Sequence, residues 1–353
     1  MIRKAIEKVV TGLDLTEEEM VGVMGLITEG EATDSQIAAF LVGLRMKGET
    51  AAEITGAARV LRTMCTPVVV SEDLGPLLDT CGTGGDGKST FNVSTVSALV
   101  AAASGARVAK HGNRSVSSSC GSADLLERLG VNIELSPEEI AVCIEEAGIG
   151  FLYAPGLHGS MRFVAPARRE TGIRTIFNIL GPLANPAKTA CQLTGVFDGD
   201  LVSLIADVFR RLGASRAVVV HGEGGYDELT VTGESRMVVL RDGLISERTV
   251  RPQDYGLDLV SEEDVPGGTV VENVRICLDV LEGGPGPARD MVLLNSGAAL
   301  VAGGLAADLG EGVGMAGEAI DSGMARGKLD QLIELSGSLH ARSVERAGTC
   351  FGG

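Results

Sequence analysis

Several absences narrow the class of this protein. The 353-residue chain has no apolar run of the roughly 18 residues that a membrane span needs. Its first eight residues, MIRKAIEK, lack the apolar core of a signal peptide. The seven cysteines are scattered without a CxxC pair, which argues for reduced thiols in a cytoplasm and against a zinc cage. A net charge of −17 disfavours nucleic acid as a partner.

What the chain contains is typical of a globular protein with about two domains. Hydrophobic residues make up 44% and charged residues 22% of the chain. Residues 1 to about 70 have the apolar spacing of helices, with start signals at Thr16, Asp34 and Thr50. From about residue 75, short apolar runs alternate with helical patterns, which favours an α/β domain with a mostly parallel sheet flanked by helices. We therefore predict an α/β fold with a small helical N-terminal domain and a large α/β domain.

The larger part of the chain allows several elements to be predicted individually. The chain is helical again from about residue 289 and has no internal repeat. A helix is expected near residues 200–212, and strands are expected near residues 106–109, 151–154, 196–197, 217–220, 229–240 and 244–250.

The most informative stretch is a glycine-rich loop at residues 82–87, between an apolar run and a helical segment. Such a loop lets backbone amides and a helix N-terminus face an anion. With Lys88 and Ser89 it also spells the Walker A pattern of nucleotide hydrolases. Asp86 inside the cradle argues against that interpretation, because an acid repels phosphate unless a metal lies between. Residues 276–279 are only a weak candidate for the Walker B strand that a hydrolase needs.

Three other groups carry chemistry. Residues 110–114, KHGNR, concentrate cations and polar donors on a predicted turn after a strand, which suits a ligand with phosphates and a carboxylate. Asp227 and Glu228 follow a second glycine loop and suit Mg²⁺ beside substrate phosphates. His158 and Arg168 lie about three turns apart if the intervening residues are helical, and the arginine can bind a small carboxylate. An acidic pair on a loop is more often solvated, and a lone histidine more often structural, than functional; for residues 110–114 the alternative is a solvated basic turn.

Taken in order, these segments resemble the anthranilate phosphoribosyltransferase family over about residues 1–335. The resemblance rests on residues 82–86 with 92–95, residues 110–114 with 121–124, residues 172–182, and residues 227–229. It implies transfer of the phosphoribosyl group from 5-phosphoribosyl 1-diphosphate to the amine of anthranilate, in tryptophan biosynthesis, by a Mg²⁺-dependent homodimer. It also implies a helical domain at residues 1–72 joined by helices from about 169–190, an α/β domain at 73–340, and a disordered tail at 341–353.

The resemblance also assigns site residues. It places phosphoribosyl diphosphate on Gly82, Thr83, Gly84, Gly85, Asp86, Thr90, Asn92, Ser94, Thr95, Lys110 and Ser122. It places anthranilate on Gly82, His111, Asn113, His158, Arg168 and Gly181, and Mg²⁺ on Ser94, Asp227 and Glu228. It implies no covalent nucleophile and no strong base. The residue types agree, since no Ser/His/Asp arrangement is apparent and the chemistry reads as positioning and charge stabilisation.

Some positions depart from the family pattern, and rival classes remain. Gly159 and Ser160 stand where the family often has proline and alanine, and Cys120 is a further variation. The rivals are a pyrimidine nucleoside phosphorylase of the same architecture, a catalytically idle relative that binds nucleic acid, and the P-loop hydrolase. Whether Lys88 contacts the ligand is open at this point.

Overall fold

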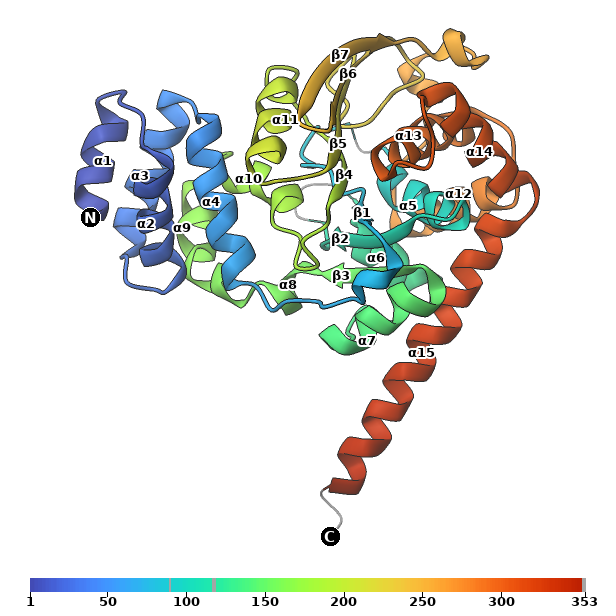
Figure 1. The fold of residues 1–353 in the computed structure, drawn as a ribbon, viewed down its shortest axis with the longest axis horizontal. Helices are drawn as coiled ribbons and strands as arrows, with labels where there is room; N and C mark the ends of the chain where they lie inside the picture. The colour runs from blue at the N-terminus through green and yellow to red at the C-terminus, as the bar shows by residue number, and fades with distance from the viewer. Residues whose placement is uncertain (89, 116–118, 351–353) are drawn as a thin grey trace.

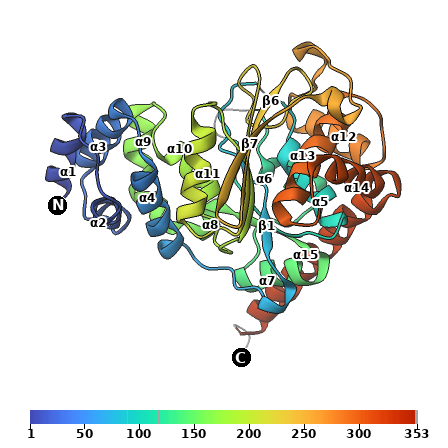
Figure 2. The same cartoon turned by 45° about the horizontal axis from the view of Figure 1, so that its top comes forward.

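The computed structural model describes residues 1–88, 90–115 and 119–350, with side chains as far as residue 341. Within these ranges no helix is both long enough and apolar enough to cross a membrane. The N-terminal helices, α9 (Ala165–Thr171) and α10 (Phe177–Leu180) gather at one end of the molecule. Helices α12 (Val270–Leu281), α13 (Pro287–Gly303) and α14 (Leu309–Asp321) lie at the other (Figures 1 and 2). The sheet runs between these two groups.

Four helices form the N-terminal end: α1 (Ile2–Val10), α2 (Glu17–Thr28), α3 (Asp34–Lys47) and α4 (Ala51–Met64). The last three begin with capping boxes, in which Thr16, Thr33 and Thr50 accept from the third helical amide. The predicted starts of these helices are therefore confirmed. Their apolar faces share one core with buried residues of a later segment at 164–184.

The sheet has seven strands in the order β3-β2-β1-β4-β5-β6-β7. Their bounds are β1 (Leu77–Asp79), β2 (Arg107–Gly112), β3 (Ile149–Tyr153), β4 (Cys191–Gly195), β5 (Arg216–Gly222), β6 (Ser235–Arg241) and β7 (Leu244–Val250). Strands β1 to β5 pair in parallel with one another, and β6 pairs antiparallel with both β5 and β7. The predicted fold class is confirmed. The chain order reverses between β1 and β4, and such a switch point is where open α/β sheets bind ligands.

Each face of the sheet packs on a different hydrophobic core. Along β5, Val218 and Val220 belong to one core, whereas Ala217 and Val219 belong to the other, because successive strand side chains point to opposite faces. The first core is covered by α5 (Val93–Ala103), α6 (Ser122–Leu129), α12 (Val270–Leu281), α13 (Pro287–Gly303), α14 (Leu309–Asp321) and α15 (Met324–Cys350). The second is covered by α11 (Leu201–Arg211) and the N-terminal helices. The sheet thus joins the helical end to the rest of the molecule.

Short elements complete the chain. They are α7 (Pro137–Val142), which continues as a π-helical turn to Ala147, α8 (Ala154–Leu157), α9 (Ala165–Thr171) and α10 (Phe177–Leu180). Single turns of 3₁₀ helix lie at Gly159–Phe163 and Gly181–Leu183.

Several local predictions are wrong. Residues 196–197, expected as a strand, lie just beyond β4, which ends at Gly195 with its last pair to β5. Lys110 and His111 are not on a turn, since β2 continues beside β3 as far as Gly112. The Walker B candidate at residues 276–279 is part of helix α12. Residues 158–168 are not one helix, so His158 and Arg168 are not related by helical turns.

The C-terminal end also differs from expectation. The backbone of α15 is helical to Cys350, where the sequence led us to expect a disordered tail from residue 341. Figure 1 shows this helix projecting away from the body of the molecule. Residues 351–353 lie outside the described ranges.

Candidate active site

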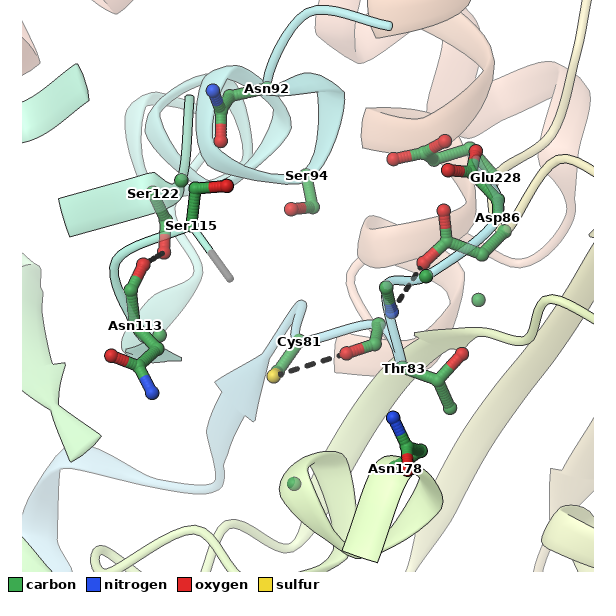
Figure 3. A pocket seen from close by; sticks show the side chains of 18 of the residues that line it. Cys81, Thr83, Asp86, Asn92, Ser94, Asn113, Ser115, Ser122, Asn178 and Glu228 are labelled. Atoms are coloured by element: carbon green, nitrogen blue, oxygen red, sulfur yellow. Dashed lines mark hydrogen bonds between the residues drawn. The ribbon is translucent and has the colours of Figure 1, made fainter. Parts of the chain in front are cut away.

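A cavity of about 670 Å³ lies at the carboxyl ends of the central strands. The ends of β1, β2, β4 and β5 contribute to its lining, and residues from α5, α9 and α10 close its sides. Figure 3 shows polar side chains from these separate segments pointing into one space. The cavity is therefore at the switch point of the sheet, where the topology favours a ligand.

The glycine loop forms one wall and is held against β4 and the loop after β5. The Thr83 amide donates to the Gly195 carbonyl at 2.9 Å, and the Gly84 amide donates to Oδ2 of Asp227 at 2.7 Å. A Cβ at Gly82 would lie 2.9 Å from that same Oδ2, and a Cβ at Gly195 would meet the Asp227 carbonyl oxygen at 1.3 Å. Glycine is required at position 195, where the two backbones approach each other so closely, whereas a side chain at position 82 would press on the Asp227 carboxylate.

Three carboxylates meet beside this loop. Asp86, Asp227 and Glu228 each offer an oxygen, and these oxygens lie within 4.8 Å of one another. Oδ2 of Asp86 and Oε2 of Glu228 are buried and have no hydrogen-bond partner in the described part of the chain. Burial and the neighbouring Asp86 charge raise the pKa of Asp227 to about 6, and burial with Asp227 raises the pKa of Glu228 well above its usual value. Unpaired oxygens crowded in this way fit a divalent cation of the Mg²⁺ type.

Lys88, the lysine of the Walker-like pattern, points elsewhere. Its Nζ is 2.9 Å from both carboxylate oxygens of Glu262 and 4.9 Å from the centre of the Tyr226 ring. It is absent from the residues that line the cavity. Together with the helical state of residues 276–279, this contradicts the P-loop hydrolase interpretation. Ser89 lies outside the described residues.

Lys110 and His111 form the floor, and His158 lies behind His111. The Nζ of Lys110 donates to the carbonyl oxygens of Thr80 and His111 at 3.4 and 3.3 Å. Nδ1 of His111 lies 3.2 Å from the Gly181 carbonyl, and its Nε2 lies 3.2 Å from Nε2 of His158. Burial lowers the pKa of both histidines to about 4, so both rings are neutral near pH 7.

These contacts define the tautomers of the two neutral rings. Because the Gly181 carbonyl can only accept, Nδ1 of His111 carries the proton. Its Nε2 must then accept the proton on Nε2 of His158. His111 therefore has no free lone pair to offer a substrate.

Arg168 is the cation on the opposite side. Its guanidinium stacks over the Phe177 ring at 5.4 Å and has no hydrogen bond or ion pair among the described residues. Burial lowers its pKa, because a charge with no partner is costly to desolvate. A carboxylate ligand would satisfy its fork of donors.

The structure brings most predicted site residues together. The cavity is lined by Gly82, Thr83, Gly84, Gly85, Asp86, Thr90, Asn92, Ser94, Lys110, His111, Asn113, Ser122, Arg168, Gly181, Asp227 and Glu228. Two predicted residues do not line it. Thr95 is buried inside α5 with its hydroxyl unpaired, and His158 lies behind His111.

Sequence reasoning missed other lining residues. Arg174 stacks on Phe197 at 4.4 Å and donates to the Gly85 carbonyl, and Asn178 points into the cavity from α10 (Figure 3). Both lie in the stretch 172–182 that carried the resemblance, so a signal was present without an assigned role.

Asn295 on α13 had no such signal. Its Oδ1 accepts from the Leu229 amide at 3.0 Å, and its Nδ2 donates to the Leu229 carbonyl at 2.8 Å. This pair of hydrogen bonds holds the backbone that follows Asp227 and Glu228. Only the folded structure brings residue 295 to residue 229.

Comparison with known proteins places this geometry in context. Residues 74–326 match the model of the α/β domain of a glycosyl transferase family, and residues 3–65 match the helical bundle domain of that family. The anthranilate phosphoribosyltransferase of Geotalea uraniireducens is 52% identical over 348 residues, covering 95% of this chain and 99% of that protein.

Solved structures agree with the relatives in sequence. The crystal structure of anthranilate phosphoribosyltransferase from Thermus thermophilus has a TM-score of 0.89 at 44% identity, covering 94% of this chain and 99% of the other. The Saccharomyces cerevisiae enzyme in complex with PRPP and Mg has a TM-score of 0.87 at 26% identity, covering 96% and 98% of the two chains.

Proposed function

The chain belongs to the anthranilate phosphoribosyltransferase family, and from that membership we propose that it transfers the phosphoribosyl group of 5-phosphoribosyl 1-diphosphate to the amine of anthranilate. The products are N-(5-phosphoribosyl)anthranilate and diphosphate, within tryptophan biosynthesis. One observation carries the proposal: a single cavity joins unpaired carboxylates beside a glycine loop to an unpaired arginine beside neutral imidazoles. The first half suits a metal-bound diphosphate, and the second suits an aromatic carboxylate.

The diphosphate half would use the glycine loop, α5 and β2. Backbone amides of the loop and the Lys110 ammonium would bind the phosphate oxygens, and hydroxyls and amides around them would hold the sugar. We assign this half to Gly82, Thr83, Gly84, Gly85, Asp86, Thr90, Asn92, Ser94, Lys110 and Ser122. Thr95 contributes through α5 and not by lining the cavity.

Asp227 and Glu228 would hold Mg²⁺, with Ser94 lining the same cavity. When bound, Mg²⁺ neutralises charge on the diphosphate, and the cation also relieves the repulsion between the two carboxylates. The Gly84 amide keeps Asp227 oriented toward the loop through Oδ2. The protein thus holds these carboxylates in place before any ligand arrives.

Arg168 would bind the anthranilate carboxylate, and His111, Asn113 and Gly181 would line the ring's position. The amine of anthranilate is conjugated to its ring and is largely unprotonated near neutrality, so it needs orientation more than a strong base. His111 fits this role, because both of its nitrogens are engaged. We assign no covalent nucleophile and no strong base. The bond between ribose and diphosphate would break before the new bond to nitrogen is far advanced.

Domain organisation and assembly complete the proposal. We assign residues 1–72, with helices from about 169–190, to the helical domain, and residues 73–340 to the α/β domain. Large apolar side chains are exposed on the helical domain at Met1, Val10, Leu13 and Met46, which supports a homodimer through this surface. The six cysteines whose side chains the structure describes are free thiols, which supports a reducing cytoplasm.

A fluorescence assay tests the reaction. Anthranilate fluorescence should fall on adding the protein, phosphoribosyl diphosphate and Mg²⁺, and should not fall when any one of these is left out. Phosphorolysis of pyrimidine nucleosides with no use of anthranilate would favour the nucleoside phosphorylase. A null result accompanied by tight DNA binding would favour an idle relative.

A further inference from the structure

The strands β1 and β2 part where the cavity begins. Their pairing ends at Leu78 and Val108, whereas β2 stays paired with β3 to Gly112, and β1 stays paired with β4 to Asp79. The glycine loop follows β1, and Lys110 lies on the part of β2 that has separated from it. Hydrogen bonds between β1 and β2 therefore do not fix the distance between the glycine loop and Lys110, which both face the cavity.

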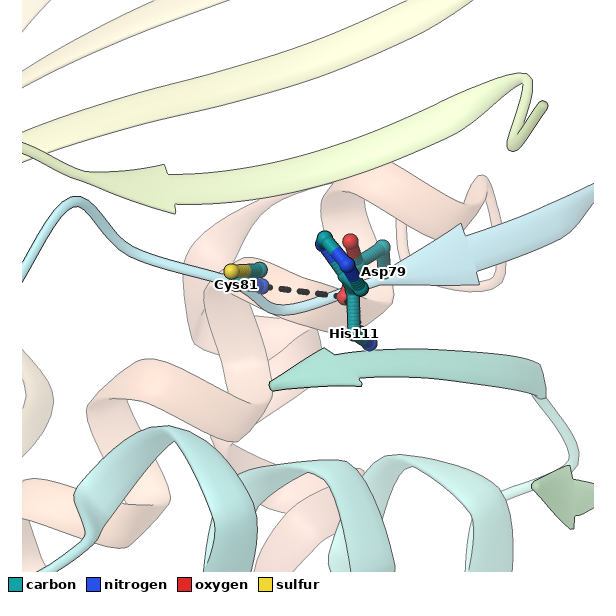
Figure 4. A group of neighbouring side chains, drawn as sticks. All are labelled: Asp79, Cys81 and His111. Carbon is teal, nitrogen blue, oxygen red and sulfur yellow. Dashed lines mark hydrogen bonds between the residues drawn. The ribbon is translucent and has the colours of Figure 1, made fainter. Parts of the chain in front are cut away.

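The carboxylate of Asp79 spans this gap. Its Oδ1 accepts from the amides of Cys81 and His111, each at 3.1 Å, so one oxygen holds the start of the glycine loop and the end of β2 (Figure 4). Its Oδ2 accepts from Nδ2 of Asn185 at 2.8 Å and Nε2 of Gln192 at 3.3 Å. Asp79 is fully buried and does not line the cavity.

Four donors and no acceptor surround this carboxyl group. The Asn185 amide cannot be reversed, because its Nδ2 also donates to the Ala109 carbonyl and its Oδ1 accepts from the Ala187 amide. The Gln192 amide could reverse, because its other partner is the Thr189 hydroxyl, but the two backbone amides and the Asn185 amide can only donate, so the carboxylate form of Asp79 matches its surroundings best. Burial raises its pKa, and the Lys110 charge and the hydrogen bonds from Asn185, His111 and Gln192 oppose that rise.

Lys110 has no carboxylate within ion-pair distance among the described residues. Its Nζ touches only carbonyl oxygens, those of Thr80 and His111. Thr80 directly precedes Cys81, whose amide donates to Asp79, and His111 itself donates to Asp79 through its own amide. The same carboxylate therefore fixes the groups that position the ammonium and supplies a nearby opposite charge.

A metal site here is excluded. Asp79, Cys81 and His111 offer ligand atoms within 4.8 Å of one another. Both oxygens of Asp79 are already engaged twice, however, and burial with the Asp79 charge raises the pKa of the Cys81 thiol to about 12. The cluster lacks a thiolate and a free oxygen.

We propose that Asp79 is a positioning residue for phosphoribosyl diphosphate: its ionic bridge across the parted strands sets the glycine-loop amides and the Lys110 ammonium at the spacing that the diphosphate needs. It acts through these groups and does not touch the substrate. This inference rests on the proposed function for its kinetic consequence, whereas the bridge itself can be tested without substrate.

The kinetic test is the Asp79→Asn variant, alone and combined with Gln192→Glu. The single change removes the charge and sets an amide against two donors, so the KM for phosphoribosyl diphosphate should rise about tenfold or more. The KM for anthranilate should rise less, because Arg168 on α9 is not held by this bridge, although His111 beside the ring is. In the double variant the carboxylate introduced by Gln192→Glu can accept from the amide introduced by Asp79→Asn and restores the charge, so at least about fivefold of the loss should be recovered. Recovery is partial because Asn185 still faces an amide.

A role limited to packing predicts a different pattern. It would lower thermal stability and the active fraction and leave both KM values unchanged, and this result would overturn the proposal. A double variant no better than Asp79→Asn would also overturn it. If Asp79→Asn does not fold, Gln192→Met removes one hydrogen-bond donor from Oδ2 with a smaller loss of stability. An unchanged KM for phosphoribosyl diphosphate in that variant would also overturn the proposal.

An NMR measurement separates this inference from the proposed function. The chain has seven cysteines and four histidines, so selective ¹⁵N labelling of these types gives few signals. In the ligand-free wild type, the Cys81 and His111 amide protons should be shifted downfield by the charged acceptor. Both should move upfield together in Asp79→Asn. If they do not move, there is no charged bridge, whatever reaction the enzyme catalyses.

Discussion

Two sets of buried carboxylates lie within reach of one cavity and differ in how they are satisfied. Asp79, beneath the floor, has each oxygen held by two donors. In the cluster at the side, Asp86 and Glu228 each leave a buried oxygen without a partner among the described residues. An unsatisfied buried acceptor is costly. Asp86 and Glu228 carry this cost beside the cavity, where a ligand can relieve it, so the contrast between the two sets of carboxylates separates scaffold from binding site.

The cations follow the same division. Arg114 is paired with Asp124 and Glu127, and Lys88 is paired with Glu262. Arg168 has no ion-pair partner in the described part of the chain, although it lines the cavity. The paired cations Arg114 and Lys88 therefore belong to the scaffold, whereas Arg168 keeps its donors available for a substrate. Substitutions on the two sides of this division should therefore have opposite signatures.

The largest effect should come from removing the unsatisfied acids. Asp227→Asn combined with Glu228→Gln should lower Mg²⁺-dependent activity by about a thousandfold, since charge stabilisation is lost. Thermal stability should rise, because the repulsion that raises the pKa of both groups disappears. The measurements are initial rates against Mg²⁺ concentration and the melting temperature. Glu263→Gln, at an exposed acid, is the control. An unchanged Mg²⁺ profile would refute the metal assignment.

Removing the unsatisfied cation should affect one substrate. Arg168→Ala should raise the KM for anthranilate about thirtyfold, the value of a charged hydrogen bond of about 2 kcal/mol. The KM for phosphoribosyl diphosphate should stay within about twofold. The neighbouring Arg169→Ala, at an exposed position, serves as the matched control. Equal effects on both KM values would contradict the assignment of Arg168.

The neutral histidine pair should make stability depend on pH. An unfolded histidine takes up its proton near pH 6.5, whereas folded His158 does so near 4, so stability is full above about 6.5 and is lost as pH falls toward 4. His158→Gln should reduce this acid loss by about 3 kcal/mol. Denaturant unfolding at pH 7 and pH 4.5 measures the difference. Parallel losses in both proteins would mean that His158 is not held neutral.

The smallest effect should come from a satisfied cation. Lys88→Ala should change the activity by about twofold or less, because Lys88 does not line the cavity and its ion pair with Glu262 is partly exposed. Glu262→Gln should behave in the same way. Steady-state rates with both substrates provide the measurement. A loss of a hundredfold in Lys88→Ala alone would bring Lys88 into the active site and weaken the division between paired and unpaired charges.

Local signals in the sequence predicted much of this arrangement. Capping boxes and apolar spacing identified the N-terminal helices, because both act within one or two turns. The family motifs named the residues of the glycine loop and of β2 that line the cavity. The partners of those residues could not be predicted in this way. Asp79 with Asn185, and Leu229 with Asn295, are more than 60 positions apart and meet only through the sheet and α13.

The strand prediction failed for a related reason. Lys110 and His111 read as a turn because they are polar, yet β3 pairs with them and burial is made tolerable by the Asp79 network. Polar residues in a buried strand can be recognised as such only once their hydrogen-bond partners are known.

The two hydrogen bonds between the Asn295 side chain and the Leu229 backbone should slow the local opening of this segment. Exchange of the Leu229 amide hydrogen with solvent requires this side chain to let go, and α13 is buried along most of its length. The backbone beside Asp227 and Glu228 should therefore open about as rarely as the core itself. The amides of the glycine loop opposite have fewer such ties and should exchange sooner. Motion of the glycine loop would then limit the rates of ligand entry and release, while Asp227 and Glu228 stay fixed.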